Sequence, residues 1–379
     1  MTLLKTENIE TAKPLPKGWH WVLLGEVCEF TYGSSLPETV RKKGVVPVYG
    51  SNGIVGYHDK SVTHSPTLII GRKGSIGEVN YSQVPCWPID TTYYVDDSKT
   101  SCNLDWLFFL LKFMKLSTLN KASGVPGLNR DDVYNQKIPF PQLAEQERLA
   151  RVLNEQMAAV EKARAAAEAR LEAAKALPAA YLREVFGSDE AKNWRRTQLG
   201  QICEIIAGQS PPGETYNREL VGLPFFQGKA DFGQLHPAVR VWCSKPIKIS
   251  LPDDILISVR APVGPTNVAN IKCCIGRGLA AIRCGGKVNK DFVLWVLKLF
   301  ELQLSRLGSG STFTSITTAE LKNFGVPIPA TLQEQERIAN GLNEQIAIAE
   351  HIKVIIETEL ESIDSLPTAL LRQAFSGGL

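Results

Sequence analysis

The chain has 379 residues, 44% of them hydrophobic and 21% charged, so it is long enough for two or three packed domains and too balanced in composition to be disordered. Its formal net charge of +3 is only mildly basic, so net charge alone does not indicate a nucleic-acid-binding protein. No apolar run approaches the ~18 residues of a membrane helix, and residues 1–17 are polar and contain proline, unlike a secretory signal, so we expect a soluble cytoplasmic protein.

The first part of the chain is typical of a small β-rich α+β domain. Short runs of β-forming residues alternate with glycine turns, and a helical pattern follows over residues 104–118. The runs predicted as strands are residues 46–49, 53–57, 67–70 and 91–95. We place this domain at residues 1–142.

Loops of this domain carry basic and polar side chains beside glycine. Arginine and lysine can bond guanine edges or phosphates, and asparagine can bond adenine at two points. Any single loop of this kind is more often a solvated turn than a DNA contact, and only its recurrence in a second domain makes it a candidate. The candidates here are Arg41, Lys42, Lys43, Ser51, Asn52, Arg72, Lys73 and Ser75.

A long helix is predicted next. From Leu143 to Leu177 there is no proline or glycine, alanine is abundant, and apolar residues recur at steps of three and four. At ~1.5 Å per residue, such a helix is roughly 50 Å long. The Pro-x-Pro at residues 139–141 predicts an extended segment before it, and Pro178 is predicted to end it before a shorter helical stretch. The apolar stripe comprises Leu149, Leu153, Met157, Val160, Ala167, Leu171 and Ala174.

The chain then repeats itself. Residues 146–156 recur as residues 335–345, and the match continues at the same offset of 189 for about forty residues without an insertion. The start of the chain recurs too, because Trp19 and residues 24–29 match Trp194 and residues 199–204. Between these segments the two halves differ in length and in almost every residue. Each half therefore combines a variable block with a strongly matched helical block.

The second variable block has the same character as the first. Strands are predicted over residues 254–259, 266–268 and 279–282, and a helical run over residues 290–306. Its candidate DNA contacts are Lys229, Arg260, Arg277, Ser311 and Thr312. The paired loops at residues 123–130 and 309–315, which precede each Pro-x-Pro, could also reach DNA or a partner.

The second helical block repeats the stripe with larger side chains, and Ile352 and Ile355 are expected to widen its apolar face. Pro367 is predicted to break this helix before a shorter helical stretch, as Pro178 does in the first copy. Where one helix has small residues in its stripe, the other has large residues at the same register. This pattern favours a paired coiled coil. Equal lengths in two copies separated by unlike domains favour an antiparallel, pseudo-twofold pair over ordinary amphipathic helices of a bundle. The predicted segments are residues 1–142, 143–189, 190–331 and 332–379. The second stripe comprises Ile338, Leu342, Ile346, Ala349, Ile356, Leu360 and Ile363.

No catalytic or metal-binding pattern emerges from the sequence. The five histidines lack metal-ligand spacing, and the chain has no nucleotide-binding loop, dinucleotide fingerprint, or adenine-methyltransferase or nuclease motif. The eight cysteines lack a Cys-x-x-Cys pair, which favours reduced core or surface thiols over metal ligands or disulfides. If this chain serves an enzyme, other chains carry out the chemistry.

This layout resembles the specificity subunits of type I restriction-modification systems over nearly the whole chain. The most specific motifs are the twice-occurring Pro-x-Pro, Glu-Gln-Glu-Arg and Leu-Asn-Glu-Gln series, together with residues 47–57 and 70–77. The resemblance implies an α+β fold with two β-rich target-recognition domains joined by two long antiparallel helices. Residues 258–264 stand where the first domain has residues 71–77, and we interpret the two as equivalent strand-to-loop positions.

The resemblance also implies a non-catalytic chain that reads a bipartite, asymmetric site in double-stranded DNA. Two methyltransferase subunits and two ATP-driven restriction subunits would join it, and S-adenosylmethionine and ATP with Mg²⁺ would belong to those partners, with no cofactor in this chain. Candidate contacts to the methyltransferase are the polar residues Glu145, Gln146, Asn154, Gln156, Glu334, Gln335, Asn343 and Gln345.

Two further expectations concern the target and the alternatives. Two recognition domains that enter the same face of a duplex lie roughly 10 base pairs apart, measured from centre to centre. Half-sites of ~3–5 base pairs then leave a gap of about 5–8 base pairs that neither domain reads. The unlike variable blocks predict unlike half-sites. A protein-interaction scaffold with a dimerising helix pair is the alternative from another class, and a modification-only or fused restriction system is also compatible with the sequence.

Overall fold

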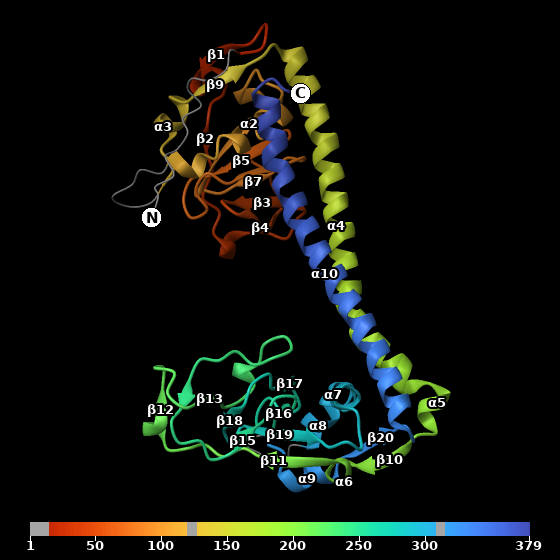
Figure 1. Ribbon diagram of the computed structural model, residues 1–379. Helices are drawn as coiled ribbons and strands as arrows, with labels where there is room; N and C mark the ends of the chain where they lie inside the picture. The colour runs from red at the N-terminus through yellow and green to blue at the C-terminus, as the bar shows by residue number, and fades with distance from the viewer. Residues whose placement is uncertain (1–14, 120–126, 308–314) are drawn as a thin grey trace. The chain divides into compact units, whose positions relative to one another are not determined.

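The computed structural model describes residues 15–119, 127–307 and 315–379. The chain has an α+β fold that divides into two compact units, Met1–Glu168 with Thr358–Leu379 and Ala169–Glu357 (Figure 1). Each unit holds one of the two repeats and a part of each long helix. Among the described residues, no helix combines the length and apolar character needed to cross a membrane.

Unit 1 is built on a four-stranded antiparallel sheet in the order β2-β8-β5-β6. A second sheet, β4-β3-β7, contains a parallel pair, β3 with β7, and a third pairs β1 with β9. The strands are β1 His20–Leu23, β2 Thr31–Tyr32, β3 Val46–Gly50, β4 Gly53–His58, β5 Thr67–Gly71, β6 Val79–Ser82, β7 Trp87–Pro88, β8 Thr92–Asp96 and β9 Lys137–Phe140. The helices are α1 Leu24–Val27, α2 Leu104–Phe113 and α3 Arg130–Tyr134, with short 3₁₀ turns at Glu38–Val40, Asp97–Lys99 and Leu116–Leu119.

Unit 2 repeats this topology. Its four-stranded antiparallel sheet has the order β11-β19-β16-β17, its second sheet again contains a parallel pair, β13 with β18, and β10 pairs with β20. The strands are β10 Arg195–Gln198, β11 Cys203–Ala207, β12 Tyr216–Asn217, β13 Leu223–Phe226, β14 Trp242–Cys243, β15 Ile249–Ser250, β16 Ile255–Ser258, β17 Thr266–Val268, β18 Cys273–Ile275, β19 Leu279–Cys284 and β20 Gly325–Ile328. The helices are α5 Asp189–Lys192, α6 Leu199–Ile202, α7 Lys290–Leu299, α8 Glu301–Leu307 and α9 Thr318–Asn323, with 3₁₀ turns at Gly213–Thr215 and Lys229–Asp231.

The central strand of each main sheet is buried on both faces. In β5, Leu68 and Ile70 pack into the main core with α2, whereas Ile69 packs on the other face with Tyr49. Strand β16 divides its side chains between two clusters in the same way. A continuous apolar run is therefore what these positions require, and the strands predicted at residues 67–70 and 254–259 are present. Seven of the eight cysteines are buried in these cores, and Cys284 is half-buried.

The long helices are α4, Leu143–Gly187, and α10, Leu332–Phe375. In unit 1 they run antiparallel and side by side, because Arg148 near the start of α4 donates to the carbonyl oxygen of Leu379 while Arg164 pairs with Asp364 at 3.4 Å (Figure 1). In each helix a series of buried residues recurs every seven positions, as in a coiled coil. These residues are Leu153, Val160, Ala167 and Ala174 in α4, and Leu342, Ala349, Ile356 and Ile363 in α10.

Two predictions about these helices are wrong. Both helices continue through Pro178 and Pro367, where the sequence predicted a break. A proline removes one backbone hydrogen bond from a helix but leaves the flanking residues able to stay helical when packing holds them. Beyond the prolines, Phe186 packs on Phe292 and Phe375 packs on Trp106, so each end is anchored in a core. Ile352 and Ile355 do not widen the buried face, because they are exposed.

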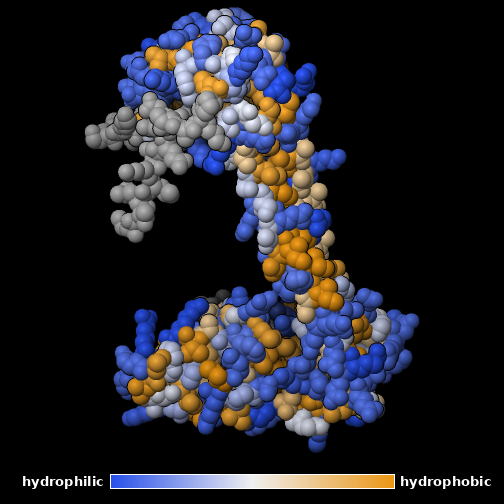
Figure 2. Space-filling view, turned by 45° about the horizontal axis from the view of Figure 1, so that its top comes forward, coloured by the Kyte–Doolittle hydropathy of each residue, from blue (hydrophilic) through white to orange (hydrophobic). Residues whose placement is uncertain are grey.

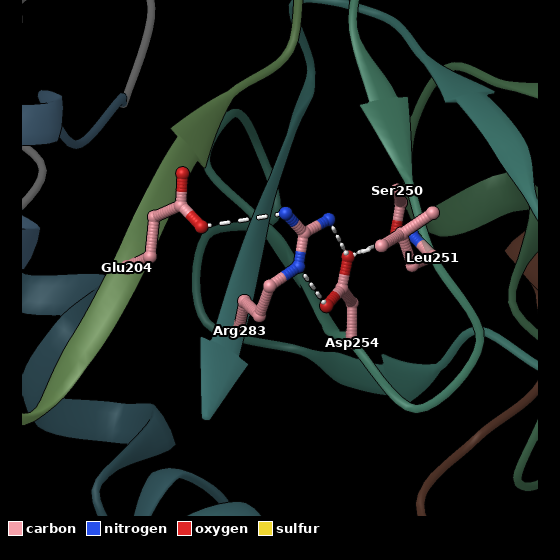
Figure 3. A network of polar contacts seen from close by, with 5 residues as sticks. All are labelled: Glu204, Ser250, Leu251, Asp254 and Arg283. Carbon is pink, nitrogen blue, oxygen red and sulfur yellow. Dashed lines mark hydrogen bonds and ion pairs between the residues drawn. The ribbon is translucent and has the colours of Figure 1, made fainter. Parts of the chain in front are cut away.

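An ion pair with a buried carboxylate joins the sheet of unit 2 to its neighbouring loop (Figure 3). Arg283 of β19 donates two hydrogen bonds to the carboxylate of Asp254, with N–O distances of 2.8 and 3.0 Å. Asp254 also accepts from the hydroxyl of Ser250 and the backbone N–H of Leu251, so its buried charge is fully hydrogen-bonded. Glu204 of β11 pairs with the other side of Arg283 at 3.3 Å from an exposed position.

We expect Asp254→Ala to lower the free energy of unfolding of the chain by about 2–3 kcal/mol, because it leaves the Ser250 hydroxyl and the Leu251 N–H without their acceptor and leaves Arg283 with only the exposed Glu204. Glu204→Ala removes the exposed partner of the same arginine and should cost less than ~1 kcal/mol. Chemical denaturation, with hydrogen exchange of the β16 and β19 amides, measures both. Equal losses for the two variants would contradict this assignment.

Candidate nucleic-acid interface

The loops that follow β5 and β16 have the same backbone construction. Gly77 donates to the carbonyl oxygen of Gly71 at 2.8 Å, and Gly264 donates to that of Ser258 at 3.0 Å. In both loops the two bonded residues are six positions apart, and both closing glycines have positive φ, 74° and 108°. The interpretation of the two loops as equivalent is therefore confirmed, and it places Lys73 and Arg260 at matching positions.

The loop after β5 lines an open hollow of about 540 Å³ in unit 1. Two predicted candidates, Arg72 and Lys73, lie in its wall. Residues 127–130 of the wall belong to the first of the two paired loops that could also reach DNA or a partner, whereas the sequence did not single out Tyr32, Tyr93 and Asp131 as contacts. The described lining residues are Tyr32, Arg72, Lys73, Tyr93, Gly127, Leu128, Asn129, Arg130 and Asp131.

Two arginines of this hollow lie against one tyrosine. The guanidinium carbon of Arg72 lies 5.3 Å from the centre of the Tyr32 ring, and that of Arg130 lies 5.4 Å from it. Tyr93 packs edge-on against Tyr32 with 5.0 Å between ring centres. Burial, followed by the neighbouring Tyr32, raises the pKa of Tyr93 to about 12, so its phenol is neutral at physiological pH. The ring faces hold the cations by cation–π attraction.

Backbone hydrogen bonds fix this loop on several sides. Arg72 donates its N–H to the carbonyl oxygen of Thr91 and accepts from the N–H of Leu128, both at 2.9 Å. Ser51, a predicted DNA contact, is buried, and its hydroxyl donates to the carbonyl oxygens of Lys73 and Thr91. Its side chain therefore positions the loop.

The matching loop of unit 2 lines a hollow of about 360 Å³. It gathers three predicted residues, Lys229, Arg260 and Arg277, all of which are exposed. Asp231 accepts from the backbone N–H of Gln227 at 2.7 Å and so shapes the turn that presents Lys229. The full lining is Ser210, Tyr216, Gln227, Gly228, Lys229, Ser258, Arg260, Ala261, Arg277 and Gly278.

The other predicted contacts that lie among the described residues do not line either hollow. Arg41 is bound within its own segment, where it donates to the carbonyl oxygens of Val55 at 2.7 Å and Leu36 at 3.3 Å. Three further candidates, Lys42, Lys43 and Asn52, are exposed, and Ser75 is half-buried. Ser311 and Thr312 lie outside the described residues.

The structure adds Tyr32, Tyr93 and Arg130 in unit 1 to the candidates. A signal for Arg130 was present, because it ends one of the two paired loops noted before each Pro-x-Pro. No sequence pattern marked the tyrosines, since their proximity depends on the pairing of β2 with β8. Among the described residues, no group of three or more His, Cys, Asp or Glu side chains could hold a metal ion.

Two predicted partner contacts form a joint that occurs once in each unit. Gln146 is 1% exposed, and its amide accepts from the N–H of Asn103 at 3.0 Å and donates to the carbonyl oxygen of Pro141. Gln335 is 3% exposed and does the same with Asn289, at 2.9 Å, and with Pro329. Asn103 and Asn289 are the N-caps of α2 and α7. These glutamines therefore hold a long helix to its domain, and the partner surface proposed below leaves them out.

Some of the remaining partner candidates are bound within the chain, and others are accessible to a partner. Asn343 is bound internally, because it accepts from the indole N–H of Trp295 at 2.8 Å and donates to Asp291. Arginine ion pairs hold the pKa of both Glu145 and Glu334 below the usual value. Three candidates are accessible to a partner: Asn154 and Gln345, which are exposed, and Gln156, which is half-buried.

An apolar stripe on α10 was not expected as a surface. Ile348, Ile352 and Ile355 are 52%, 38% and 50% exposed. Their spacing of four and three residues puts them on one face of the helix. Figure 2 shows hydrophobic side chains reaching the surface along the long helices. A soluble helix that exposes such a stripe is typical of a protein-binding surface.

Comparisons with known proteins agree with this architecture. Residues 16–168 and 191–362 both match the family described as "Type I restriction modification DNA specificity domain". The chain is 34% identical over 302 residues to a putative type I restriction enzyme MjaX specificity subunit from Methanocaldococcus jannaschii, covering 72% of this chain and 67% of that protein.

Two solved structures are similar over almost the whole chain. The HsdS subunit from Thermoanaerobacter tengcongensis has a TM-score of 0.70 and 34% identity, covering 97% of this chain and 99% of that one. A chain from a structure described as "Structural basis underlying complex assembly and conformational transition of the type I R-M system" has a TM-score of 0.78 and 33% identity, covering 97% and 100%.

The joint can be tested on the glutamines of α10. We expect Gln335→Ala to lower the free energy of unfolding by about 1–3 kcal/mol, because the N–H of Asn289 and the carbonyl of Pro329 lose a buried partner. Gln345 is an exposed glutamine of the same helix, and Gln345→Ala should leave the free energy of unfolding within ~0.5 kcal/mol of that of the parent protein. Thermal or chemical denaturation gives both values, and an unchanged Gln335→Ala variant would refute the joint.

Proposed function

The chain belongs to the family of type I restriction-modification DNA specificity subunits, and we propose that each of its two repeats reads one half of a divided DNA target. Members of this family are the non-catalytic chains that recognise the DNA target. The proposal concerns how this chain divides that task, and it places the two hollows within the two DNA-contacting surfaces.

One observation carries the proposal: the same backbone position in the two repeats bears different side chains. Strand pairing sets Tyr32 opposite Tyr93 in unit 1 and Ala207 opposite Ala280 in unit 2. The N–H of Gly33 bonds to Thr92, next to Tyr93, and the N–H of Gly208 bonds to Leu279, next to Ala280, so the two pairs occupy matching positions.

The charged side chains around these positions also differ. The hydrogen bonds that the two loops share align Arg72 with Val259 and Lys73 with Arg260. Because base edges in the major groove are told apart by their donors and acceptors, different side chains on one frame select different bases. The two half-sites should therefore differ in sequence.

Local positive charge supports DNA binding in spite of the modest net charge. Arg72, Lys73 and Arg130 line one hollow, and Lys229, Arg260 and Arg277 line the other. Lysine and arginine bind backbone phosphates through release of counterions, and they position the base-reading groups. Exposed Lys42, Lys43 and Asn52 remain proposed contacts at the edge of the first surface.

We propose that the paired helices set the unread gap between the half-sites. Helix α4 is continuous over 45 residues and contributes to both units, and α10 does the same over 44. A continuous helix has a fixed rise of ~1.5 Å per residue, so a pair of them behaves as a spacer of defined length. The gap should then be fixed and close to the 5–8 base pairs expected for two readers about one turn apart.

The partners proposed are methyltransferase and restriction subunits, which would supply S-adenosylmethionine and ATP with Mg²⁺. We place the methyltransferase surface on the long helices, where the polar Asn154 and Gln345 and the apolar stripe of Ile348, Ile352 and Ile355 are exposed. Support comes from the 33% identical chain in the structure whose description concerns complex assembly of the type I system.

The function is tested by mapping adenine methylation in a host that expresses this chain with its methyltransferase. We expect a split, asymmetric motif with two unlike half-sites and a fixed gap. An uninterrupted or palindromic motif would refute the division of labour. Absence of new methylation from a stable complex would favour the protein-interaction scaffold instead.

The partner surface is tested by two matched substitutions on α10. We expect Ile355→Asp to weaken association with the methyltransferase by more than about tenfold, because an aspartate would be buried without a partner. Val354→Asp changes a neighbour that is equally exposed, 53% against 50%, but faces a different direction on the helix. It should leave co-purification unchanged, and equal effects of both variants would exclude the stripe as the docking site.

A further inference from the structure

We propose that the hollow of unit 1 is a phosphodiester clamp, in which Arg72 and Arg130, held against Tyr32, bind one backbone phosphate of the target DNA. The inference rests on the proposed function and deepens it. It assigns this hollow to the sugar-phosphate backbone and leaves the reading of bases in unit 1 to side chains at its rim.

The charge balance of the hollow is the first argument. Arg72, Lys73 and Arg130 line it together with one carboxylate, Asp131. Among the described residues, no carboxylate lies within ion-pair distance of either arginine. Two guanidinium groups beside one ring repel each other, and a bound anion would relieve that repulsion.

The way the arginines are held is the second argument. Arg72 donates to the carbonyl oxygen of Asp90 at 2.6 Å, and its Nε is buried without an acceptor among the described residues. Arg130 donates to the carbonyl oxygen of Phe30 at 3.3 Å. Both side chains are thus fixed before any ligand binds, and their charge is partly withdrawn from water. Preorganised, partly desolvated cations attract an anion more strongly than solvated ones.

The shape and charge of the site favour a phosphate over a base. A base edge in the major groove is uncharged and is usually reached by a side chain that projects from the protein. Here the cations line a concave wall, which suits a group that projects from the DNA. Tyr93 supplies no compensating charge, because its pKa is raised to about 12. A phosphate provides the full negative charge and the several acceptors that two guanidinium groups require.

Among the described residues, unit 2 shows no pair of arginines held on one ring at the matching place. Alanines, Ala207 and Ala280, stand where unit 1 has Tyr32 and Tyr93. We therefore place the clamp in unit 1, as a sequence-independent anchor. If the phosphates of the half-site read by unit 1 are made neutral one at a time, one position should then lower the affinity for DNA much more than the others.

The test uses the assembled complex with its methyltransferase and the duplex identified by methylation mapping. Each phosphate of the half-site read by unit 1 is replaced in turn by a neutral methylphosphonate, and affinity is measured for the parent protein and for Arg130→Ala. We expect one replacement to weaken the parent complex by about tenfold or more. The same replacement should have no effect on Arg130→Ala, which should already bind about tenfold more weakly with an unchanged motif.

Four further variants keep the test decisive. Arg130→Lys retains the charge and should recover part of the affinity even if Arg130→Ala folds poorly. Tyr32→Phe should behave as the parent protein, whereas Tyr32→Ala should lose the sensitive position. Arg41→Ala removes an arginine of the same unit that is bound to Val55 and Leu36, and it should leave the sensitive position in place.

Two results would overturn the clamp in distinguishable ways. If Arg130→Ala relaxes the motif at one base and stays sensitive to every phosphate that matters to the parent protein, the hollow reads a base, and the proposed function still stands. If the parent complex shows no split motif at all, the proposed function fails, and the clamp fails with it.

Discussion

A buried glutamine joint, used twice, is the constraint on which the rest of the structure depends. Gln146 and Gln335 each use both ends of the side-chain amide to tie the N-cap of a domain helix to the Pro-x-Pro strand before a long helix. Because both amides are almost fully buried, leaving either group unpaired would be costly. Each domain is therefore fixed to its helix in the same way, whatever its loops contain. The matched blocks of the sequence encode this joint together with the heptad packing of α4 and α10.

The common frame explains how the loops can differ without loss of the fold. The strand order of the four-stranded sheet and the hydrogen bonds of the loops beside it are the same in both repeats, and glycine occupies the same place where two backbones approach. A Cβ atom at Gly33 or at Gly208 would lie 2.1 Å from a backbone oxygen of the neighbouring loop, so both positions require glycine. Around this frame, unit 1 has Tyr32 and Tyr93 where unit 2 has alanines. Side-chain chemistry varies while the backbone that presents it stays constant, which suits a protein that recognises two unlike half-sites.

Much of this architecture could be predicted from the sequence, because the repeat and the helical periodicity are local signals. The strands from β3 to β8 and from β16 to β19 that were predicted are present, as are both long helices. The breaks at Pro178 and Pro367 were wrong, because aromatic anchoring beyond each proline is a tertiary effect. The arginine–tyrosine cluster was missed, since it depends on β2 pairing with β8 and on a loop returning from residue 127. Gln146 and Gln335 look like surface residues in sequence, and only burial against the N-caps gives them their role.

The central claim is that the joints and helices form a common frame and that each domain reads its half-site independently. Its most direct test is a chimaera in which residues 190–331 are replaced by the corresponding domain of a family relative, with both long helices kept. Methylation mapping of the chimaera should show one changed half-site, with the other half-site and the gap unchanged. A change in both half-sites or in the gap would contradict the account, because the frame would then not be independent of the domains it carries.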